Sequence, residues 1–136
     1  MIRALYVADS EATAWAEWYR HTAELGVPPS TRMPRDAWRI EVDIIEVADL
    51  TSTAMLHAHG IRRLRPARAQ WPQTQLIGEA YWAGGSAAVL APSAAHVGGT
   101  VLAVFRAIPG PIAGVDALPP PTRYAELPQV PQGLRT

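Results

Sequence analysis

The chain has 136 residues, a length typical of one domain with its own hydrophobic core. Its 12 basic and 12 acidic residues cancel, so composition gives no electrostatic reason to expect binding to nucleic acid or to an anionic membrane. Cysteine is absent, which excludes disulfides, thiolate metal sites and cysteine nucleophiles. We expect no signal peptide and no membrane span, and therefore a cytoplasmic protein.

The first elements are a short strand and a helix. Residues 5–7 are apolar and predict a strand. Asp9 or Ser10 can cap the helix that follows, because a short side-chain oxygen accepts hydrogen bonds from the free N–H groups of a first turn. This helix should run to about Leu25, since Gly26 and the prolines after it favour termination.

The rest of the chain mixes strands and helices. An alternating pattern over residues 38–47 predicts a strand region with Ile40, Val42 and Ile44 on one face. Later segments predict a short helix within 48–61, a helix over 71–82, and apolar strands over 86–93 and 100–106. We therefore predict one α+β domain over residues 1–108, with a mixed or antiparallel sheet. Seven of the 13 prolines lie in residues 109–131, which predicts an extended tail over 109–136 that is draped on the domain or disordered.

Glu17 is the first candidate for chemistry. It shares a helix face with Ala14, His21 and Glu24, and periodicity alone is typical of a solvated face. Ala14 nevertheless leaves room for a ligand to approach the carboxylate, and Tyr6 precedes this helix. An aromatic ring beside a carboxylate suits a flat cationic ring on a sugar, such as nicotinamide on ribose. The carboxylate would stabilise the positive charge that develops as the glycosidic bond breaks.

Other chemistries have weaker support. His57 and His59 are two residues apart, diverge on a helix and have no acidic neighbour, so we expect no metal site. Ser93 and His96 could serve a serine hydrolase, although the glycine-flanked nucleophile elbow is absent. A cluster of basic residues, without interleaved aromatics, is typical of a solvated surface and does not predict a nucleic-acid site; it comprises Arg62, Arg63, Arg65 and Arg68.

Two segments resemble the RES-domain family, the toxins of bacterial toxin–antitoxin pairs. They are "ALYVADSEATAWAEWYRH" and "GEAYWAGGSAAVLAPSAAHVGGTVLAVF", and the resemblance extends from about Ala4 to Arg106. It implies a fold similar to ADP-ribosyltransferases and cleavage of NAD by hydrolysis, phosphorolysis or ADP-ribosyl transfer. NAD is then a substrate, with no prosthetic group. The implied partner is a helix-turn-helix antitoxin, with homo-oligomerisation left open and no direct contact with nucleic acid or membrane.

The resemblance also assigns residues. Tyr6, Glu17 and Ser93 match the tyrosine, glutamate and serine of the family and are the expected catalytic and NAD-binding residues. Gln75 is a secondary candidate for NAD binding. Ser93 is expected to hold the nicotinamide or ribose end by hydrogen bonding.

The family arginine has no match in the chain. It precedes the tyrosine strand in the family, and Arg3 is poorly placed to replace it. Arg20 and Arg39 are further candidates for phosphate contacts. We therefore expect weak NAD binding, and an alternative is a catalytically inactive binding protein with the RES fold.

Overall fold

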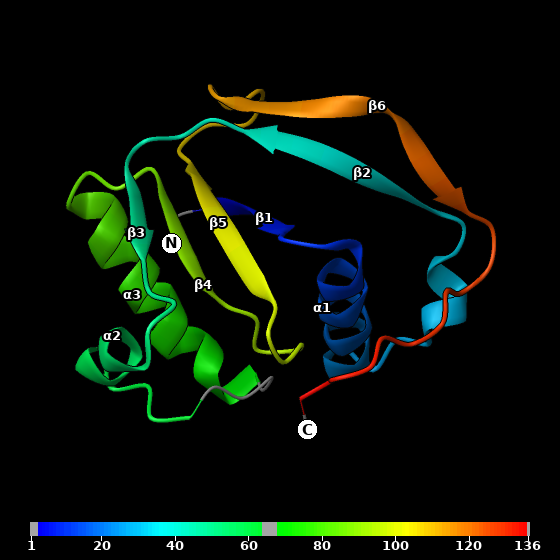
Figure 1. Cartoon of the computed structure of the whole chain (residues 1–136), viewed down its shortest axis with the longest axis horizontal. Coiled ribbons are helices and arrows are strands. Elements are labelled where there is room, and N and C mark those ends of the chain that lie inside the picture. The colour runs from blue at the N-terminus through cyan, green and yellow to red at the C-terminus, as the bar shows by residue number, and fades with distance from the viewer. Residues whose placement is uncertain (1–2, 64–67, 136) are drawn as a thin grey trace.

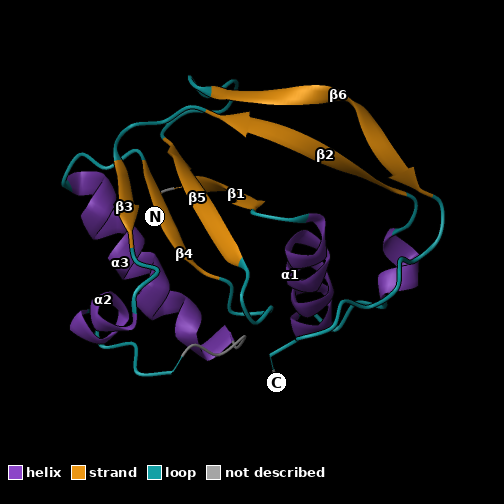
Figure 2. Ribbon diagram, in the orientation of Figure 1, coloured by secondary structure: helices purple, strands orange, loops and turns teal. Residues whose placement is uncertain are grey.

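A computed structural model describes residues 3–63 and 68–135 (Figure 1). It is an α+β domain with a mixed sheet, which confirms the predicted fold class (Figure 2). Along the chain the principal elements are β1 (Arg3–Ala8), α1 (Glu11–Glu24), β2 (Arg35–Val42), β3 (Val47–Asp49), α2 (Thr53–Ala58), α3 (Trp71–Ala83), β4 (Ala88–Pro92), β5 (Thr100–Arg106) and β6 (Val115–Tyr124). Two short 3-10 helices cover Pro29–Arg32 and Arg68–Gln70. Within the described ranges no helix has the length and apolar character needed to span a membrane.

The main sheet has the strand order β1-β5-β4-β3. Both β1 and β4 pair antiparallel with β5, and β3 pairs parallel with β4. It follows that β1, β3 and β4 run in the same direction and that their carboxyl ends share one edge of the sheet. The loops after these three strands therefore start close together, as loops at the ends of parallel strands do in α/β folds.

Helix α1 begins where the sequence predicts. The Ser10 hydroxyl accepts a hydrogen bond from the Thr13 backbone N–H at 3.1 Å, so Ser10 is the N-cap. The buried face of the helix carries Trp15, Ala16 and Thr22 together with Thr13. Ala16 is fully buried, which lets the helix backbone lie close to the rest of the domain.

Helix α3 packs on the face of β5 that carries Phe105. A Cβ at Gly78 would lie 3.6 Å from Cε1 of Phe105, an ordinary packing distance, so this part of the helix faces the Phe105 ring. On the opposite face of the sheet, Val104 and Ala88 are paired across β4 and β5 and are almost fully buried. The core of the domain therefore includes these two strands.

Strands β2 and β6 form a separate antiparallel pair beside the main sheet (Figure 1). Their register shifts between Ala37 and Arg39, where residues 119–121, all proline, lie opposite Trp38. Proline cannot donate a ladder hydrogen bond, which explains why these residues fall at an irregularity. The proline-rich region therefore contains a strand, β6, that pairs with β2.

The predicted strand over residues 38–47 is wrong in one respect. It is two strands in different sheets, because β2 ends at Val42 and β3 starts at Val47. The backbone hydrogen bond from Ala87 to the Glu46 carbonyl marks the point where the chain joins the main sheet. Alternation reports which side chains are buried, and it does not show a change of partner strand.

Candidate functional site

Glu17 and Ser93 form a direct hydrogen bond. The Ser93 hydroxyl donates to Oε1 of Glu17 at 2.6 Å, although the two residues are 76 positions apart in the chain. Glu17 lies on α1, which follows β1, and Ser93 follows β4. The common carboxyl edge of these strands therefore brings together the two residues that the sequence singled out.

The Ser93 oxygen is the centre of a tight turn. It accepts backbone N–H bonds from Ala95 at 3.1 Å and from His96 at 2.9 Å while its own proton goes to Glu17. The residue is 0% exposed. Two donors on the oxygen polarise the hydroxyl, so its hydrogen bond to the carboxylate is strengthened. This arrangement fixes the orientation of Glu17, whose other oxygen has no described partner in the chain.

His96 connects this turn to α1. Its Nδ1 lies 2.9 Å from the Thr13 hydroxyl, and its Nε2 lies 2.8 Å from the Gln132 carbonyl. A carbonyl can only accept, so Nε2 carries a proton, and in the neutral ring Nδ1 accepts from Thr13. The Ser10 hydroxyl in turn donates to Thr13 at 3.0 Å. The hydrogen bonds then run in one direction from Ser10 through Thr13 and His96 to Gln132.

These contacts do not support a serine hydrolase. A general base would have to hold a ring nitrogen within hydrogen-bond distance of the Ser93 hydroxyl. Both ring nitrogens of His96 have other partners, and its contact with Ser93 is made by the backbone N–H. The buried hydroxyl is also closed to an incoming acyl group.

The C-terminal segment, residues 128–135, packs against α1 and the Ser93 turn. The Tyr19 hydroxyl donates to the Pro128 carbonyl at 2.6 Å, and burial raises the pKa of Tyr19 and so keeps this proton in place. Beyond the Gln132 contact, backbone bonds join Val97 to Gly133 and Arg135 to Ala95. The segment therefore closes over the turn that holds Ser93.

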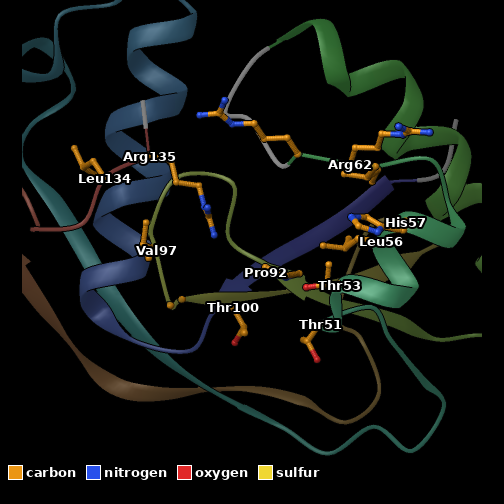
Figure 3. Close-up of a pocket in the computed structure, with 14 residues that line it drawn as sticks. Thr51, Thr53, Leu56, His57, Arg62, Pro92, Val97, Thr100, Leu134 and Arg135 are labelled. Carbon is orange, nitrogen blue, oxygen red and sulfur yellow. The ribbon is translucent and has the colours of Figure 1, made fainter.

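A pocket of about 700 Å³ lies beside this turn (Figure 3). That volume falls in the range of small-molecule sites. In Figure 3, Leu56, His57 and Arg62 lie on one side, and Val97, Leu134 and Arg135 lie on the other. Among the described residues the lining includes three arginines, Arg62, Arg63 and Arg135, and no carboxylate. The pocket is therefore basic in a chain of zero net charge.

The remaining predicted residues make no side-chain hydrogen bond with Glu17 or Ser93 in the described part of the chain. Tyr6 is on β1 opposite Ala103, and its side chain is 69% exposed. Gln75 is exposed on α3. The two histidines diverge: His57 lines the pocket, and His59 pairs with the Tyr81 hydroxyl at 2.7 Å.

The basic cluster is divided. Arg62 and Arg63 are exposed and also line the pocket. Arg65 lies outside the described residues, and so does the side chain of Arg68.

Three site residues were not found by sequence reasoning: Thr13, Gly99 and Arg135. Thr13 is one of the few buried polar residues, at 1% exposure, but a threonine in the first turn of a helix is unremarkable in sequence. Gly99 is needed because a Cβ there would collide with the Thr13 side chain. The Gly-Gly pair at residues 98–99 was the available signal for a close approach. No sequence signal pointed to Arg135, because no motif surrounds it in residues 128–135.

Comparison with known proteins gives one result. The family model described as "RES domain" matches residues 1–126 of the chain. No curated protein and no solved structure matches it. Residues 1–126 contain the strand, helix and turn that carry Tyr6, Glu17 and Ser93. The chain thus belongs to the RES-domain family.

Proposed function

We propose that this chain cleaves NAD at the bond between nicotinamide and ribose. The observation that supports this most strongly is the hydrogen bond from Ser93 to Glu17, which fixes a half-buried carboxylate at the carboxyl edge of the sheet. The basic pocket lies next to the Ser93 turn and is lined by Pro92 and residues 97–100, whereas Glu17 and Ser93 are not among its lining residues. RES-domain proteins are associated with the use of NAD. The acceptor of the ADP-ribose group is water, phosphate or a protein side chain.

Glu17 would act on the charge that forms during cleavage. As nicotinamide leaves, positive charge spreads over the anomeric carbon and the ring oxygen of the ribose. A carboxylate held in place before the reaction stabilises that charge without reorganising in the transition state. The oxygen of Glu17 that does not face Ser93 is the one available to a ribose hydroxyl.

Ser93 is assigned a positioning role. The family resemblance implies a contact between this serine and the nicotinamide or ribose, but here the hydroxyl is buried and donated to Glu17. Ser93 would therefore affect NAD cleavage by positioning the Glu17 carboxylate. Tyr6 keeps the role of a stacking surface, since its ring is exposed and makes no ring contact with another described residue.

Family membership also supports a proposal for the cellular role. RES-domain proteins are usually paired with antitoxins. We propose that this chain is a toxin that arrests growth by consuming NAD or by modifying a target. A helix-turn-helix antitoxin would neutralise it by binding. Loss of viability on expression, with rescue by a neighbouring antitoxin gene, is the corresponding expectation.

Incubation with NAD tests the proposal directly. We expect release of free nicotinamide, measured by chromatography, with ADP-ribose as the second product in buffer. A faster reaction that yields a phosphorylated ADP-ribose when phosphate is added would identify phosphorolysis. No nicotinamide release under either condition, with or without an added protein acceptor, would refute the proposed activity.

Ser93→Ala should lower NAD turnover by about a hundredfold, because a small misplacement of a catalytic group has an effect of this size. It should also destabilise the fold by about 1–3 kcal/mol, since the buried N–H groups of Ala95 and His96 lose their acceptor. Turnover is measured by nicotinamide release and stability by urea denaturation. Ser86→Ala, with no described side-chain hydrogen bond, is the matched control and should change neither quantity.

Covalent labelling of Ser93 distinguishes a serine hydrolase from an enzyme that cleaves NAD. We expect no covalent labelling of the native chain by a fluorophosphonate, because Ser93 is buried and His96 is not its base. Stoichiometric labelling at Ser93 that disappears in His96→Ala would instead establish a serine hydrolase.

A further inference from the structure

Arg135 has two distinct environments. Its Nε donates to the Ser93 carbonyl at 3.0 Å, and its side chain also lines the pocket. In Figure 3 the side chain points from the C-terminal segment toward the loop between Pro92 and Thr100. The ion pair recorded among the described residues joins Arg123 and Asp36, so the Arg135 guanidinium has no carboxylate partner there. Its terminal nitrogens make no side-chain hydrogen bond to another described residue, and the side chain lines the pocket.

The wall opposite Arg135 is basic too. Arg62 and Arg63 follow α2 and line the same pocket, with His57 beside them. Three guanidinium groups with no lining carboxylate favour an anion that carries more than one charge. A phosphate group accepts paired hydrogen bonds from a guanidinium, and a diphosphate offers two such groups.

We propose that Arg135, from the C-terminal segment, is a ligand-binding residue that holds a diphosphate group together with Arg62 and Arg63. This deepens the proposed function and rests on it only for the identity of the whole substrate. Residues 127–135 lie beyond the part of the chain that matches the family model. The C-terminal segment would then add to this chain a phosphate contact that the matched region does not contain.

Ser93 connects the two halves of the site. Its side chain binds Glu17, and its carbonyl binds Arg135. A carboxylate for the ribose and a guanidinium for the phosphates therefore lie on two sides of one residue. In NAD the nicotinamide ribose is bonded directly to the diphosphate, so a carboxylate and a guanidinium held by the same residue match the order of these groups in the substrate.

Titration calorimetry with ADP-ribose and with adenosine tests the diphosphate assignment. The full chain should bind ADP-ribose more tightly than adenosine, and added salt should weaken only ADP-ribose binding. Arg135→Gln should weaken ADP-ribose binding by about ten- to a hundredfold, the loss of one charge-assisted contact, and leave adenosine binding unchanged. Arg123→Gln, on β6 and outside the pocket lining, is the matched control and should bind like the native chain.

A charge-conserving variant tests the second contact of Arg135. Arg135→Lys should bind ADP-ribose within a few-fold of the native chain, because the charge remains. NAD turnover should still fall, because lysine cannot bond the Ser93 carbonyl and a phosphate through a planar fork. If Arg135 had a purely structural role, Arg135→Gln and Arg135→Lys would both lower the stability of the fold. ADP-ribose binding and NAD turnover would then change together in each variant.

Two outcomes overturn the inference. One is unchanged ADP-ribose binding in Arg135→Gln with a native thermal melt, or in Arg62→Gln/Arg63→Gln, whose exposed side chains are not needed for folding. The other is failure of the native chain to bind ADP-ribose at millimolar concentration. If ADP-ribose binding depends on these arginines but nicotinamide is never released, the proposed function fails and the diphosphate site stands. If the native chain releases nicotinamide and either of these two outcomes occurs, the proposed function stands and the inference fails.

Discussion

Glu17→Gln is expected to reduce nicotinamide release by about a hundred- to a thousandfold, the usual effect of removing one positioned electrostatic group. The replacement is nearly isosteric and can still accept the hydrogen bond from Ser93 through its amide oxygen. What it removes is the negative charge that would meet the developing positive charge on the ribose. The rate is measured at saturating NAD, so that a change in binding does not obscure the change in chemistry.

Glu24→Gln on the same helix is the matched control. Its side chain is also partly buried, but it is not hydrogen-bonded to the Ser93 turn. We expect unchanged turnover for this variant and near-native urea midpoints for both. A well-folded Glu17→Gln protein that releases nicotinamide at the native rate would remove Glu17 from the mechanism.

Gly99→Ala is expected to destabilise the fold strongly, although it adds only one methyl group. A Cβ at Gly99 would lie only 2.8 Å from Cγ2 of Thr13 and nearer still to its hydroxyl oxygen, with Nδ1 of His96 at 3.1 Å. Thr13 is 1% exposed and hydrogen-bonded, so it cannot move aside freely. Overpacking of this kind costs about 1–3 kcal/mol in the free energy of unfolding, which urea denaturation measures.

Two companion variants separate the clash from the general effect of alanine. Gly78→Ala places a Cβ at 3.6 Å from Phe105, an ordinary contact, and removes a glycine from a helix interior. It should be neutral or stabilising by up to about 1 kcal/mol. Adding Thr13→Ala to Gly99→Ala should give less destabilisation than the sum of the two single variants, because one clash is relieved. Strict additivity in urea denaturation would show that the collision does not occur.

Much of the fold was predictable because local rules govern it. The Ser10 cap, the glycine after α1 and the apolar strand over residues 100–106 each follow from short-range chemistry. The separation of β2 from β3 was not predictable, because it depends on which strands pair across the fold. The strand β6 was obscured for a related reason. Its prolines are tolerated at an irregular position that only the partner strand reveals.

The candidate site was predicted in the same uneven way. Glu17 and Ser93 were identified through family resemblance, and the structure joins them. Periodicity alone favoured a solvated Glu17, because the spacing of residues within one helix contains no information about a partner 76 residues away. Arg62 and Arg63 were interpreted as a solvated surface. They are exposed, but they also face Arg135 across a pocket whose second wall comes from the end of the chain.

The packing of the C-terminal segment has a consequence for how the protein is made. The contact between Tyr19 and Pro128 spans 109 residues, and the Glu17 and Ser93 contact spans 76. Contacts between residues so distant in sequence form late, because the entropy of closing the intervening loop is lost before the contact stabilises anything. On the ribosome, α1 emerges long before either of its partners. A growing chain therefore carries Glu17 before the residues that orient it have been synthesised. The complete site can form only after Arg135 has been added.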